Sequence, residues 1–513
     1  MTISSFTSSS FDGQLVRIEV DIRRGIPGVD IIGLPDGAVL ESRDRFRAAL
    51  RNCGFEIPKG RILINLAPAG VRKEGASIDL ALAAAVLFNS GLITTSPDKQ
   101  VMILGELMLS GEIRPVAGVL SAVSVAARNE IDTIIVPQSN RAEAASLEWG
   151  SVYGVRNISE LPALFAAMVH GRTAAEPDLD TELKPDLRKP AVDFHDIIDL
   201  PFVKRGLEVA AAGRHNLLLF GPPGGGKTMC SRAMAGILPE LTREESIEVT
   251  RIYSAAGLLP EGSGLIRRPP FREPHHSASE EGIIGGGRSV KPGEVSLAHK
   301  GVLFLDETPE FGKRLLQSLR EPAEEGRVDI ARAGRSLIYP ADFQLILAAN
   351  PCPCGNLGKK EAVCVCSRKE VINYWKKLGG ALLDRIDIRI PVEPVTVDLY
   401  SSAEQESSID VAKRVEKAVW LQHKRFGNEV FKRNGRIPQG SLKKYCKMSD
   451  EAEKSYLSAV KKMKISSRAC VAVIKTSRSI ADLRSGDKIE KNDIHEAIQH
   501  RRYGETDFFW DKL

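Results

Sequence analysis

The pattern of apolar and polar residues divides the 513-residue chain into regions of different predicted structure. In the first region, short apolar runs typical of strands mix with stretches that have the period of amphipathic helices. The strand-like runs are Val16–Ile22, Ile62–Leu66, Val101–Leu104 and Thr133–Val136, and the helical stretches are Gly37–Asn52 and Ile78–Asn89. Residues 1–168 are therefore expected to form a separate α+β domain.

A linker separates this region from two others. Residues 169–194 are rich in proline and charge and lack apolar periodicity, which is typical of a linker. Over residues 195–395, apolar runs alternate with helical stretches, which predicts an α/β fold with a parallel sheet and crossover helices. The runs are Asn216–Phe220, Val302–Leu305, Phe343–Ala349 and Ile386–Pro391. Strand signals fade in residues 396–513, which are expected to form an all-α lid.

Composition and charge narrow the class of protein. With 43% hydrophobic and 27% charged residues, the chain resembles ordinary globular proteins, which excludes collagen-like, coiled-coil and wholly disordered classes. The net charge of +5 conceals an asymmetry, because residues 411–513 carry 24 basic and 13 acidic side chains, a net of +11, against −6 for residues 1–410. The basic segment favours contact with a phosphate backbone, and a solvated helical face explains it equally well.

The first residues, the apolar stretches and the cysteines bear on location. Residues 1–11 have neither the basic nor the apolar region of a signal peptide, and Leu80–Phe88 is far too short to span a bilayer. Eight cysteines in so long a chain do not make a secreted disulfide scaffold. We therefore expect a cytoplasmic protein that does not associate with a membrane.

The strongest chemical signal is the sequence GPPGGGKT, which follows the apolar run NLLLF and opens a helical stretch. This is the context that a phosphate-binding loop requires. Its glycines let backbone N–H groups surround a phosphate, its lysine reaches the β- and γ-phosphates, and its threonine hydroxyl ligates Mg²⁺. The predicted nucleotide-binding residues are Gly221, Pro222, Pro223, Gly224, Gly225, Gly226, Lys227 and Thr228.

Later polar residues complete a predicted site for nucleotide hydrolysis. An apolar run ends in two carboxylates, of which Asp306 is expected to hold Mg²⁺ through water and Glu307 to polarise the attacking water. Asn350 ends the next run and suits contact with the lytic water or the γ-phosphate. Arg385 suits a transition-state clamp supplied in trans by a neighbouring subunit, or a local ion pair with the aspartates that flank it.

These motifs and their order resemble those of AAA+ ATPases of the magnesium-chelatase-like branch, and more narrowly those of the ComM/YifB proteins. With the N-terminal domain, the resemblance covers nearly the whole chain. The segments that carry it are GPPGGGKT (221–228), FREPHHSASEEGIIGGGRSVKPGEVSLAHKGVLFLDE (271–307), EFGKRLLQSLREPAEEGRVDIARA (310–333), ANPCPCG (349–355), LLDRIDI (382–388) and ISSRAC with KTSRSIADL (465–483).

The resemblance implies a role for each site residue. The roles are Walker A for Gly221–Thr228, Walker B for Asp306 and Glu307, sensor 1 for Asn350, arginine finger for Arg385 and sensor 2 for Arg468. Arg478, on the same predicted helix as Arg468, is the alternative sensor 2. Thr308 departs from the leucine that usually follows the Walker B glutamate, at a position outside the chemistry.

The resemblance also implies two elements that face the central pore of a ring. An insertion in helix 2 is expected at Phe271–Glu294, and a β-hairpin before sensor 1 at Val328–Ile338. Basic side chains there suit a phosphate backbone that slides, and solvated turn residues are the alternative. The residues concerned are His275, His276, Arg288 and Lys291 in the insertion, and Arg332 and Arg335 in the hairpin.

Two CxC pairs lie a short loop apart, at Cys352, Cys354, Cys364 and Cys366. Four thiolates with this spacing can close a tetrahedral Zn²⁺ site, and paired cysteines in a cytoplasmic protein favour a structural metal. A redox pair, an iron–sulfur site and unliganded thiols are the alternatives. The remaining cysteines, expected to be core residues or ordinary thiols, are Cys53, Cys230, Cys446 and Cys470.

The N-terminal domain resembles the proteolytic domain of Lon, a fold shared with the ribosomal S5 domain-2-like superfamily. The segments that carry this resemblance are GELMLSGEIRPVAGVL (105–120), EIDTIIVP (130–137) and KEGASIDLALA (73–83). Ser77 falls where Lon-type proteases have their nucleophile, but residues 117–127 lack the lysine that would serve as its base. We therefore expect no peptidase activity, Ser77 as a helix N-cap, and a role of the domain in assembly or in DNA contact.

The resemblance as a whole implies a hexameric, ATP- and Mg²⁺-dependent DNA motor or helicase. A ComM-like protein would promote branch migration of recombination intermediates during natural transformation and homologous recombination, acting on single-stranded or branched DNA. The alternatives are a magnesium-chelatase-like ATPase that remodels a protein partner, an ATP-dependent protease and a non-enzymatic nucleotide switch. The motifs themselves predict the ATPase, whereas the DNA substrate depends mainly on the resemblance.

Overall fold

The computed structural model of the chain describes residues 2–7, 12–93, 100–169, 192–287, 290–332, 335–359, 362–393, 405–463 and 466–503. The chain forms two compact units. The first comprises residues 1–187, 242–267 and 333–338, and the second comprises the rest. Residues 242–267, which in sequence fall inside the region predicted to be the ATPase, therefore pack as part of the first unit.

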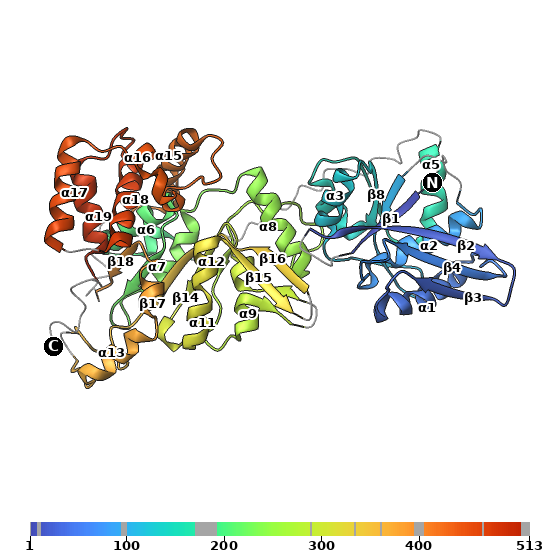
Figure 1. Cartoon of the computed structure of the whole chain (residues 1–513), viewed down its shortest axis with the longest axis horizontal. Helices are drawn as coiled ribbons and strands as arrows, with labels where there is room; N and C mark the ends of the chain where they lie inside the picture. Colours follow the sequence, from blue (N-terminus) through green and yellow to red (C-terminus); the bar gives the residue numbers. More distant parts are fainter. Residues whose placement is uncertain are drawn as a thin grey trace. The chain divides into compact units, whose positions relative to one another are not determined.

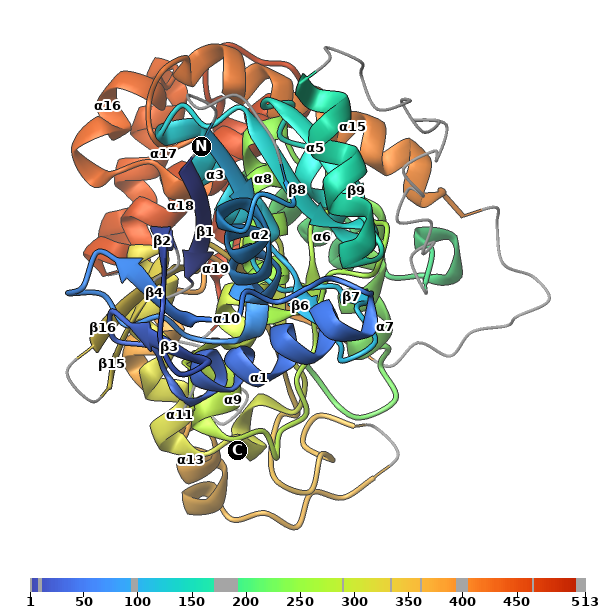
Figure 2. The same cartoon turned by 90° about the vertical axis from the view of Figure 1, so that its right-hand side faces the viewer.

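A seven-stranded mixed sheet is the framework of the first unit, with strand order β3-β4-β2-β1-β5-β8-β9 (Figure 2). All four strand-like runs predicted in this region are strands. Residues 2–7 are a strand that was not predicted, because the sequence TISSFT has no apolar alternation, although it lies inside the sheet with Ser4 and Ser5 buried. The strands are β1 (Thr2–Thr7), β2 (Gln14–Arg23), β3 (Gly28–Ile32), β4 (Arg61–Ala67), β5 (Gln100–Ile103), β8 (Thr133–Pro137) and β9 (Ser151–Val155).

Helices cover both faces of this sheet. One apolar core packs the sheet against α1, α2 and α5, and a second packs it against α3 and α4. The helices are α1 (Gly37–Asn52), α2 (Asp79–Asn89), α3 (Val119–Arg128), α4 (Arg141–Ala145) and α5 (Leu161–Val169). A short hairpin of β6 (Glu106–Leu107) and β7 (Ile113–Arg114) completes the fold.

The prediction that Ser77 caps a helix is wrong. Ser77 lies in the middle of a 3₁₀ turn, Ala76–Ile78, and α2 begins after that turn without a side-chain cap. Because the turn delays the start of the helix, the hydroxyl of Ser77 is not at the N-cap position. Lys73, a fully buried lysine shortly before it, donates to the backbone oxygen of Gly33 at 2.8 Å.

Helix α8 (Arg243–Ala256) packs on α3 within the first unit. Gly118, at the start of α3, donates its N–H to the backbone oxygen of Ser254 at 3.1 Å and to its hydroxyl at 3.0 Å. The Ser254 hydroxyl in turn donates to Glu143, whose carboxyl has a pKa raised by burial. Arg251 adds an ion pair with Asp12 at 2.8 Å. Polar contacts as well as packing thus hold this helix in place.

A five-stranded parallel sheet is the framework of the second unit, with strand order β11-β14-β17-β10-β18. Figure 1 labels three of its strands, β14, β17 and β18. All four runs predicted in this region are strands of this sheet. The strands are β10 (Leu217–Phe220), β11 (Phe271–Arg272), β14 (Val302–Leu305), β17 (Gln344–Ala349) and β18 (Ile388–Pro391). In register, Phe220 lies opposite Ala349 and Leu305 lies opposite Leu347, so the carboxyl ends of the three central strands meet at one edge.

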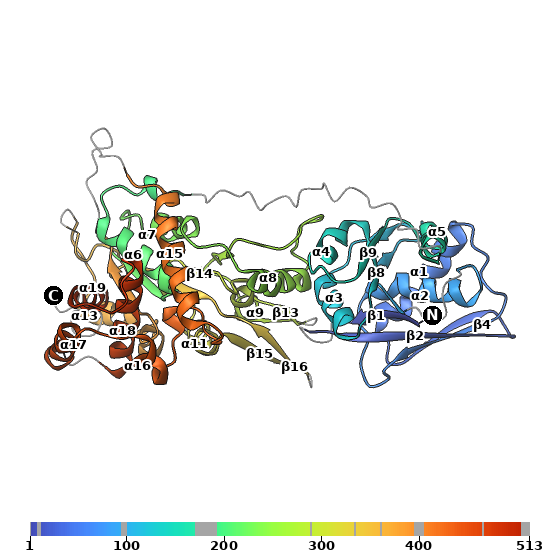
Figure 3. The ribbon, with the colours of Figure 1, turned by 90° about the horizontal axis from the view of Figure 1, so that it is seen from above.

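Helices surround this sheet, and the described residues of the C-terminal region, 405–463 and 466–503, form helices and no strand, as expected (Figure 3). Helices α15 and α18 of that region pack on α6 (Pro201–Gly213). The helices around the sheet are α7 (Lys227–Ala233), α9 (Glu280–Ile284), α10 (Glu294–Leu297), α11 (Lys313–Ser318), α12 (Arg320–Glu325), α13 (Arg368–Lys376) and α14 (Gly380–Leu383). The C-terminal helices are α15 (Ser408–Phe426), α16 (Leu442–Tyr445), α17 (Asp450–Met463), α18 (Ser467–Leu483) and α19 (Lys491–Arg501).

Two small hairpins lie at the positions of the predicted pore elements. The first, of β12 (Gly285–Gly286) and β13 (Lys291–Pro292), lies between α9 and α10. The second consists of β15 (Arg327–Arg332) and β16 (Arg335–Pro340). In the part of the chain that the structure describes, no helix is long and apolar enough to cross a lipid bilayer.

Candidate nucleotide-binding site

Lys227 lies at the centre of the candidate site, at the first position of α7 and close to the end of β17. Its Nζ donates to the backbone oxygens of Gly221 at 2.7 Å and Pro222 at 3.0 Å, and to Oδ1 of Asn350 at 3.0 Å. Desolvation lowers the pKa of this amine, and the nearby carboxylates oppose the shift. The phosphate-loop lysine and the predicted sensor 1 are therefore in direct contact.

Thr228 and Asp306 form the second contact of the site. The Thr228 hydroxyl donates to Oδ2 of Asp306 at 2.6 Å, and the other carboxylate oxygen accepts the N–H of Glu307 at 2.8 Å. A hydroxyl and a carboxylate this close can ligate the same hard cation, directly or through water. Thr228 and Asp306 are therefore suited to bind a Mg²⁺ ion that also contacts a nucleotide phosphate.

The backbone of the loop requires its glycines. Gly224 and Gly226 have φ of 86° and 83°, in the left-handed region that favours glycine. At Gly221, a Cβ would lie 2.0 Å from the backbone oxygen of Val392, so the residue that follows strand β18 leaves no room for a side chain. The conformation of the loop therefore depends on glycine at these three positions.

Thr308, the departure from the family pattern, is buried behind the carboxylates. Its hydroxyl is within hydrogen-bond distance of the backbone oxygen of Leu305 at 2.8 Å and of Ala348 at 3.0 Å. These oxygens belong to β14 and β17, so the threonine links the strand ends that present Asp306 and Asn350. A leucine could not make either hydrogen bond.

His276 lies beside Glu307, a contact that the sequence did not indicate. Its Nδ1 is 3.9 Å from Oε2 of Glu307, and its ring packs on that of His275 with centroids 4.1 Å apart. That these histidines face the pore of a ring stays a prediction. Residues 271–272 form strand β11, parallel to β14, so the residues after both strands emerge at the same edge of the sheet.

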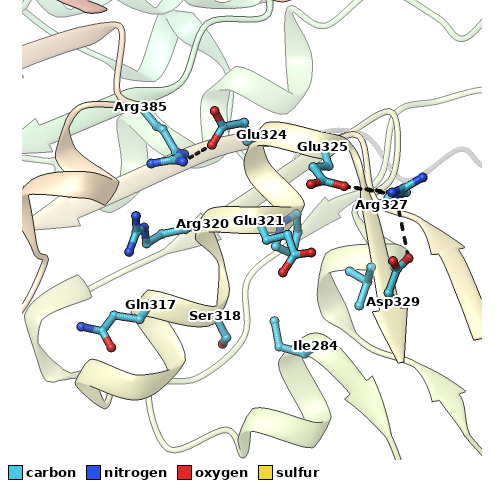
Figure 4. Close-up of a pocket in the computed structure, with 12 residues that line it drawn as sticks. Ile284, Gln317, Ser318, Arg320, Glu321, Glu324, Glu325, Arg327, Asp329 and Arg385 are labelled. Atoms are coloured by element: carbon cyan, nitrogen blue, oxygen red, sulfur yellow. Dashed lines mark hydrogen bonds and ion pairs between the residues drawn. The ribbon is translucent and has the colours of Figure 1, made fainter. Parts of the chain in front are cut away.

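Arg385 lies in a charged cavity of about 420 Å³ (Figure 4). Its guanidinium donates to the backbone oxygen of Ala381 at 2.6 Å and pairs with Glu324. The local alternative predicted for this arginine, an ion pair with a flanking aspartate, is wrong, because Asp384 pairs with Arg468 and Asp387 with His215. The other charged residues that line the cavity are Arg320, Glu321, Glu325, Arg327 and Asp329.

Comparisons with known proteins match all three regions of the chain. Family profiles match at residues 193–399 (Magnesium chelatase, subunit ChlI), 18–140 (Subunit ChlI of Mg-chelatase) and 405–501 (Magnesium chelatase, subunit ChlI C-terminal). An uncharacterized protein of Mycobacterium tuberculosis is 39% identical over 96% of this chain and 97% of its own. Protein YifB of Escherichia coli is 38% identical over 95% of this chain and 94% of its own length. Competence protein ComM of Haemophilus influenzae is 36% identical over 97% of this chain and 97% of its own length.

The chain belongs to the ComM/YifB family of magnesium-chelatase-like proteins. This membership, together with the parallel sheet and its phosphate loop, makes the second unit an ATPase core of the AAA+ type. ATP and Mg²⁺ are the ligands that such a core implies. Because the relatives match over nearly their whole length, the three regions of this chain are a shared arrangement.

The two sensor 2 candidates of the family motif have different surroundings. Arg478 is fully buried and donates to Asp482 at 2.8 Å and to the backbone oxygen of Asp487 at 2.8 Å. Arg468 is half exposed near the start of α18, and its Nη1 lies 3.7 Å from Oδ2 of Asp384, next to Arg385 in the chain. These contacts favour a structural role for Arg478 and leave Arg468 accessible to a nucleotide.

Replacing either arginine should separate the two roles. Arg478→Ala leaves the buried carboxylate of Asp482 with one arginine fewer, so we expect a loss of stability of about 3 kcal/mol, measured by chemical denaturation. Arg468→Ala should leave stability unchanged and lower ATP turnover. If Arg478→Ala left the stability intact while abolishing turnover, the assignment would have to be reversed.

A second cavity, of about 620 Å³, lies next to the phosphate loop and was not predicted. Its volume suits a small organic ligand. Two contacts place this cavity beside Phe220, the residue directly before the phosphate loop. Val392, whose chain neighbours line the cavity, donates its N–H to the backbone oxygen of Phe220, and the ring of the lining residue Tyr503 lies 5.6 Å from that of Phe220. The lining residues are Asp199, Leu200, Pro201, Phe202, Val203, Pro391, Glu393, Gln499, Arg502 and Tyr503.

The four clustered cysteines converge in the loop between β17 and α13. Their sulfur atoms all lie within 4.8 Å of one another. Cys352 is buried, and burial raises its pKa to about 12, whereas a hydrogen bond from the N–H of Asn356 lowers the pKa of Cys354 to about 6. The sequence therefore predicted correctly which cysteines come together.

The basic residues of the predicted pore elements are only partly described. Lys291 is exposed on β13. Arg332 ends β15 and Arg335 begins β16, on either side of the hairpin tip. Arg288 lies outside the described residues. Contact of these residues with DNA stays a prediction.

Proposed function

We propose that this protein is an ATP-dependent DNA motor of the ComM type, a hexameric ring that promotes branch migration of recombination intermediates. The observation that carries the proposal is the convergence of Lys227, Thr228, Asp306 and Asn350 at the carboxyl ends of β10, β14 and β17. In this arrangement Lys227 binds the β- and γ-phosphates, and Thr228 and Asp306 hold Mg²⁺. Bound Mg²⁺ supplies positive charge that offsets charge developing on the phosphates.

Glu307 would act as the base of the hydrolysis step. Its side chain is more than half exposed at the end of β14, where it can reach a water molecule. Its backbone, with φ of 47°, lies in a region that is strained for a residue with a side chain. This conformation directs the residues after β14 away from the strand, and the neighbouring His276 can hold the carboxylate in position.

Arg385 would complete the site of the neighbouring chain. Its contacts are with Glu324 and Ala381, outside its own phosphate loop, and its buried Nε has no hydrogen-bond partner within the described residues. A guanidinium can clamp the charge that develops on a transferred phosphoryl group. Arg468, next to Asp384, would approach the same nucleotide.

Support for DNA as the substrate comes from a relative and from charge. The Haemophilus influenzae relative is named a competence protein, which fits a role in the uptake or recombination of DNA. In the C-terminal helices, several arginines form ion pairs within the chain, such as Arg425 with Asp482 and Arg484 with Asp493. The exposed positive charge is therefore carried largely by lysines, including Lys443, Lys447, Lys454, Lys461, Lys462, Lys488 and Lys491, which suit contact with phosphates irrespective of sequence.

The proposal is tested with the full-length chain on three- and four-way DNA junctions. We expect junctions to accelerate ATP turnover and to be resolved into their products only when ATP is present. Lys227→Ala is the matched control, because it removes the amine that contacts the phosphates and should be inactive in both assays. The DNA part of the proposal fails if turnover is the same with and without junctions and the junctions persist.

A magnesium-chelatase-like ATPase that remodels a protein partner is the second candidate. It is favoured by the family profiles, whose descriptions name a subunit of magnesium chelatase. ATP turnover that is insensitive to every DNA structure, but accelerated by a protein partner, would support this candidate instead.

A further inference from the structure

We infer that Cys352, Cys354, Cys364 and Cys366 bind one Zn²⁺, and that this zinc clamps the loop after β17 against the phosphate loop. The sulfur atoms of Cys352 and Cys364 are 3.7 Å apart, those of Cys354 and Cys364 are 3.7 Å apart, and those of Cys352 and Cys354 are 3.4 Å apart. Four thiolates at a Zn–S distance of about 2.3 Å occupy the corners of a tetrahedron with edges of about 3.8 Å. The protein already holds its sulfurs close to that geometry.

The same distances argue against the other states of these thiols. Each of these three separations is far longer than a disulfide bond of about 2.05 Å, and all four sulfurs, not one pair, converge. In a cluster of several iron atoms, the four cysteines are divided among different irons, and sulfurs bound to different irons lie farther apart than the 4.8 Å within which all four lie here. A single tetrahedral metal ion fits, and four thiolate ligands without an open position are typical of structural zinc.

The described residues 362–366, which include the second pair of cysteines, bury little apolar surface. Val363 and Val365, which flank Cys364, are 83% and 82% exposed, so they contribute no apolar core. A short segment that buries so little apolar surface is ordered chiefly by a metal or a disulfide. Since the thiols are not paired as disulfides, a metal ion is the stabilising element that the segment requires.

The cysteine loop contacts the nucleotide-binding residues directly. Cys352 lies two positions after Asn350, whose side chain accepts a hydrogen bond from Lys227. Gly355, with φ of 75°, packs against the phosphate loop so closely that a Cβ would lie 2.9 Å from Cδ of Pro223. On the other side, the indole N–H of Trp375 donates to the backbone oxygen of Pro351 at 3.0 Å. The zinc would therefore fix the position of Asn350 relative to Lys227, a consequence that rests on the proposed ATPase function.

Metal analysis of the purified full-length protein tests the site. We expect about one zinc per chain, and its loss in the double variant Cys364→Ser/Cys366→Ser. Cys470→Ser is the matched control, a half-buried cysteine outside the cluster that should leave the zinc in place. Exchange of zinc for Co²⁺ in the wild type should give the visible absorption of tetrahedral thiolate coordination, which decides the question even if the double variant does not fold.

ATP turnover tests the clamp separately. In the double variant we expect turnover to fall roughly 10- to 100-fold, the range for a small displacement of a site residue, with a raised KM for ATP. Lys227→Ala should keep its zinc while losing turnover, so failure of the ATPase proposal and failure of this inference are distinguishable. The zinc site would be overturned by any of three results: wild-type protein without metal, iron in place of zinc, or zinc retained in the double variant. The clamp would be overturned if ATP turnover stayed unchanged in protein without zinc.

Discussion

Replacing Glu307 by glutamine is expected to lower ATP turnover by about 10²- to 10⁴-fold, the contribution of a positioned general base. Glutamine keeps the size and the hydrogen-bonding capacity of the side chain but cannot take a proton from water. The contacts of Lys227 with Asn350 and of Thr228 with Asp306 do not involve this side chain, so ATP should still bind. Phosphate release measures the loss, and binding of a fluorescent ATP analogue measures the retained affinity.

Glu310→Gln is the matched control for this substitution. Glu310 is an exposed glutamate three residues further along, at the end of the 3₁₀ turn Thr308–Glu310. We expect this variant to hydrolyse ATP at the wild-type rate. Wild-type turnover in Glu307→Gln would remove Glu307 from the chemistry. A Glu307→Gln variant that leaves every phenotype intact would favour a non-enzymatic nucleotide switch over a motor.

Replacing Arg385 by alanine is expected to lower ATP turnover by about 10³-fold or more, as for other arginine fingers. Within its own chain the guanidinium contacts Glu324 and Ala381 and not the phosphate loop, so any effect on turnover is expected to come from the site of a neighbouring chain. Arg385→Lys should be nearly as inactive, because an ammonium group cannot reproduce the planar fork of donors. Steady-state phosphate release, with binding of ATP as a second measurement, checks both variants.

Glu324→Gln distinguishes this role from a structural one. Glu324 is the carboxylate that pairs with Arg385 within the chain. If the ion pair mattered only for folding, Glu324→Gln and Arg385→Ala would have similar effects on turnover. The account predicts instead that Glu324→Gln retains most of the activity, since the arginine remains available.

The sequence was sufficient to predict those parts of the fold and of the site that are encoded in short, contiguous stretches of residues. The strands of the second unit are continuous apolar runs because a parallel sheet is buried on both faces, and the phosphate loop and the two CxC pairs are contiguous motifs. Since the carboxyl ends of parallel strands share an edge, the sequence could place Asn350 at the same edge of the sheet as the phosphate loop. The direct contact of Asn350 with Lys227 is seen only in the structure, where β10 and β17 are neighbours. The roles of these residues in hydrolysis stay predictions.

What the sequence did not reveal depends on tertiary contacts. Strand β1 is polar in sequence and is stabilised by pairing with β2 and β5, not by an apolar pattern. Helix α8 packs on α3 through contacts between residues more than one hundred positions apart, such as Gly118 with Ser254. The proximity of His276 to Glu307 likewise arises from the pairing of β11 with β14. Strand β11 has only two residues, too few to be recognised in the sequence.

The central claim is that two neighbouring chains share one ATP site, and a mixing experiment tests it most directly. Lys227→Ala and Arg385→Ala are each expected to be inactive, because one lacks the phosphate-binding amine and the other the guanidinium given to its neighbour. When the two are co-assembled in equal amounts, about a quarter of the interfaces in a symmetric ring unite an intact loop with an intact arginine. The account predicts that ATP turnover reappears in the mixture. A mixture as inactive as its components, or an Arg385→Ala ring as active as the wild type, would contradict it.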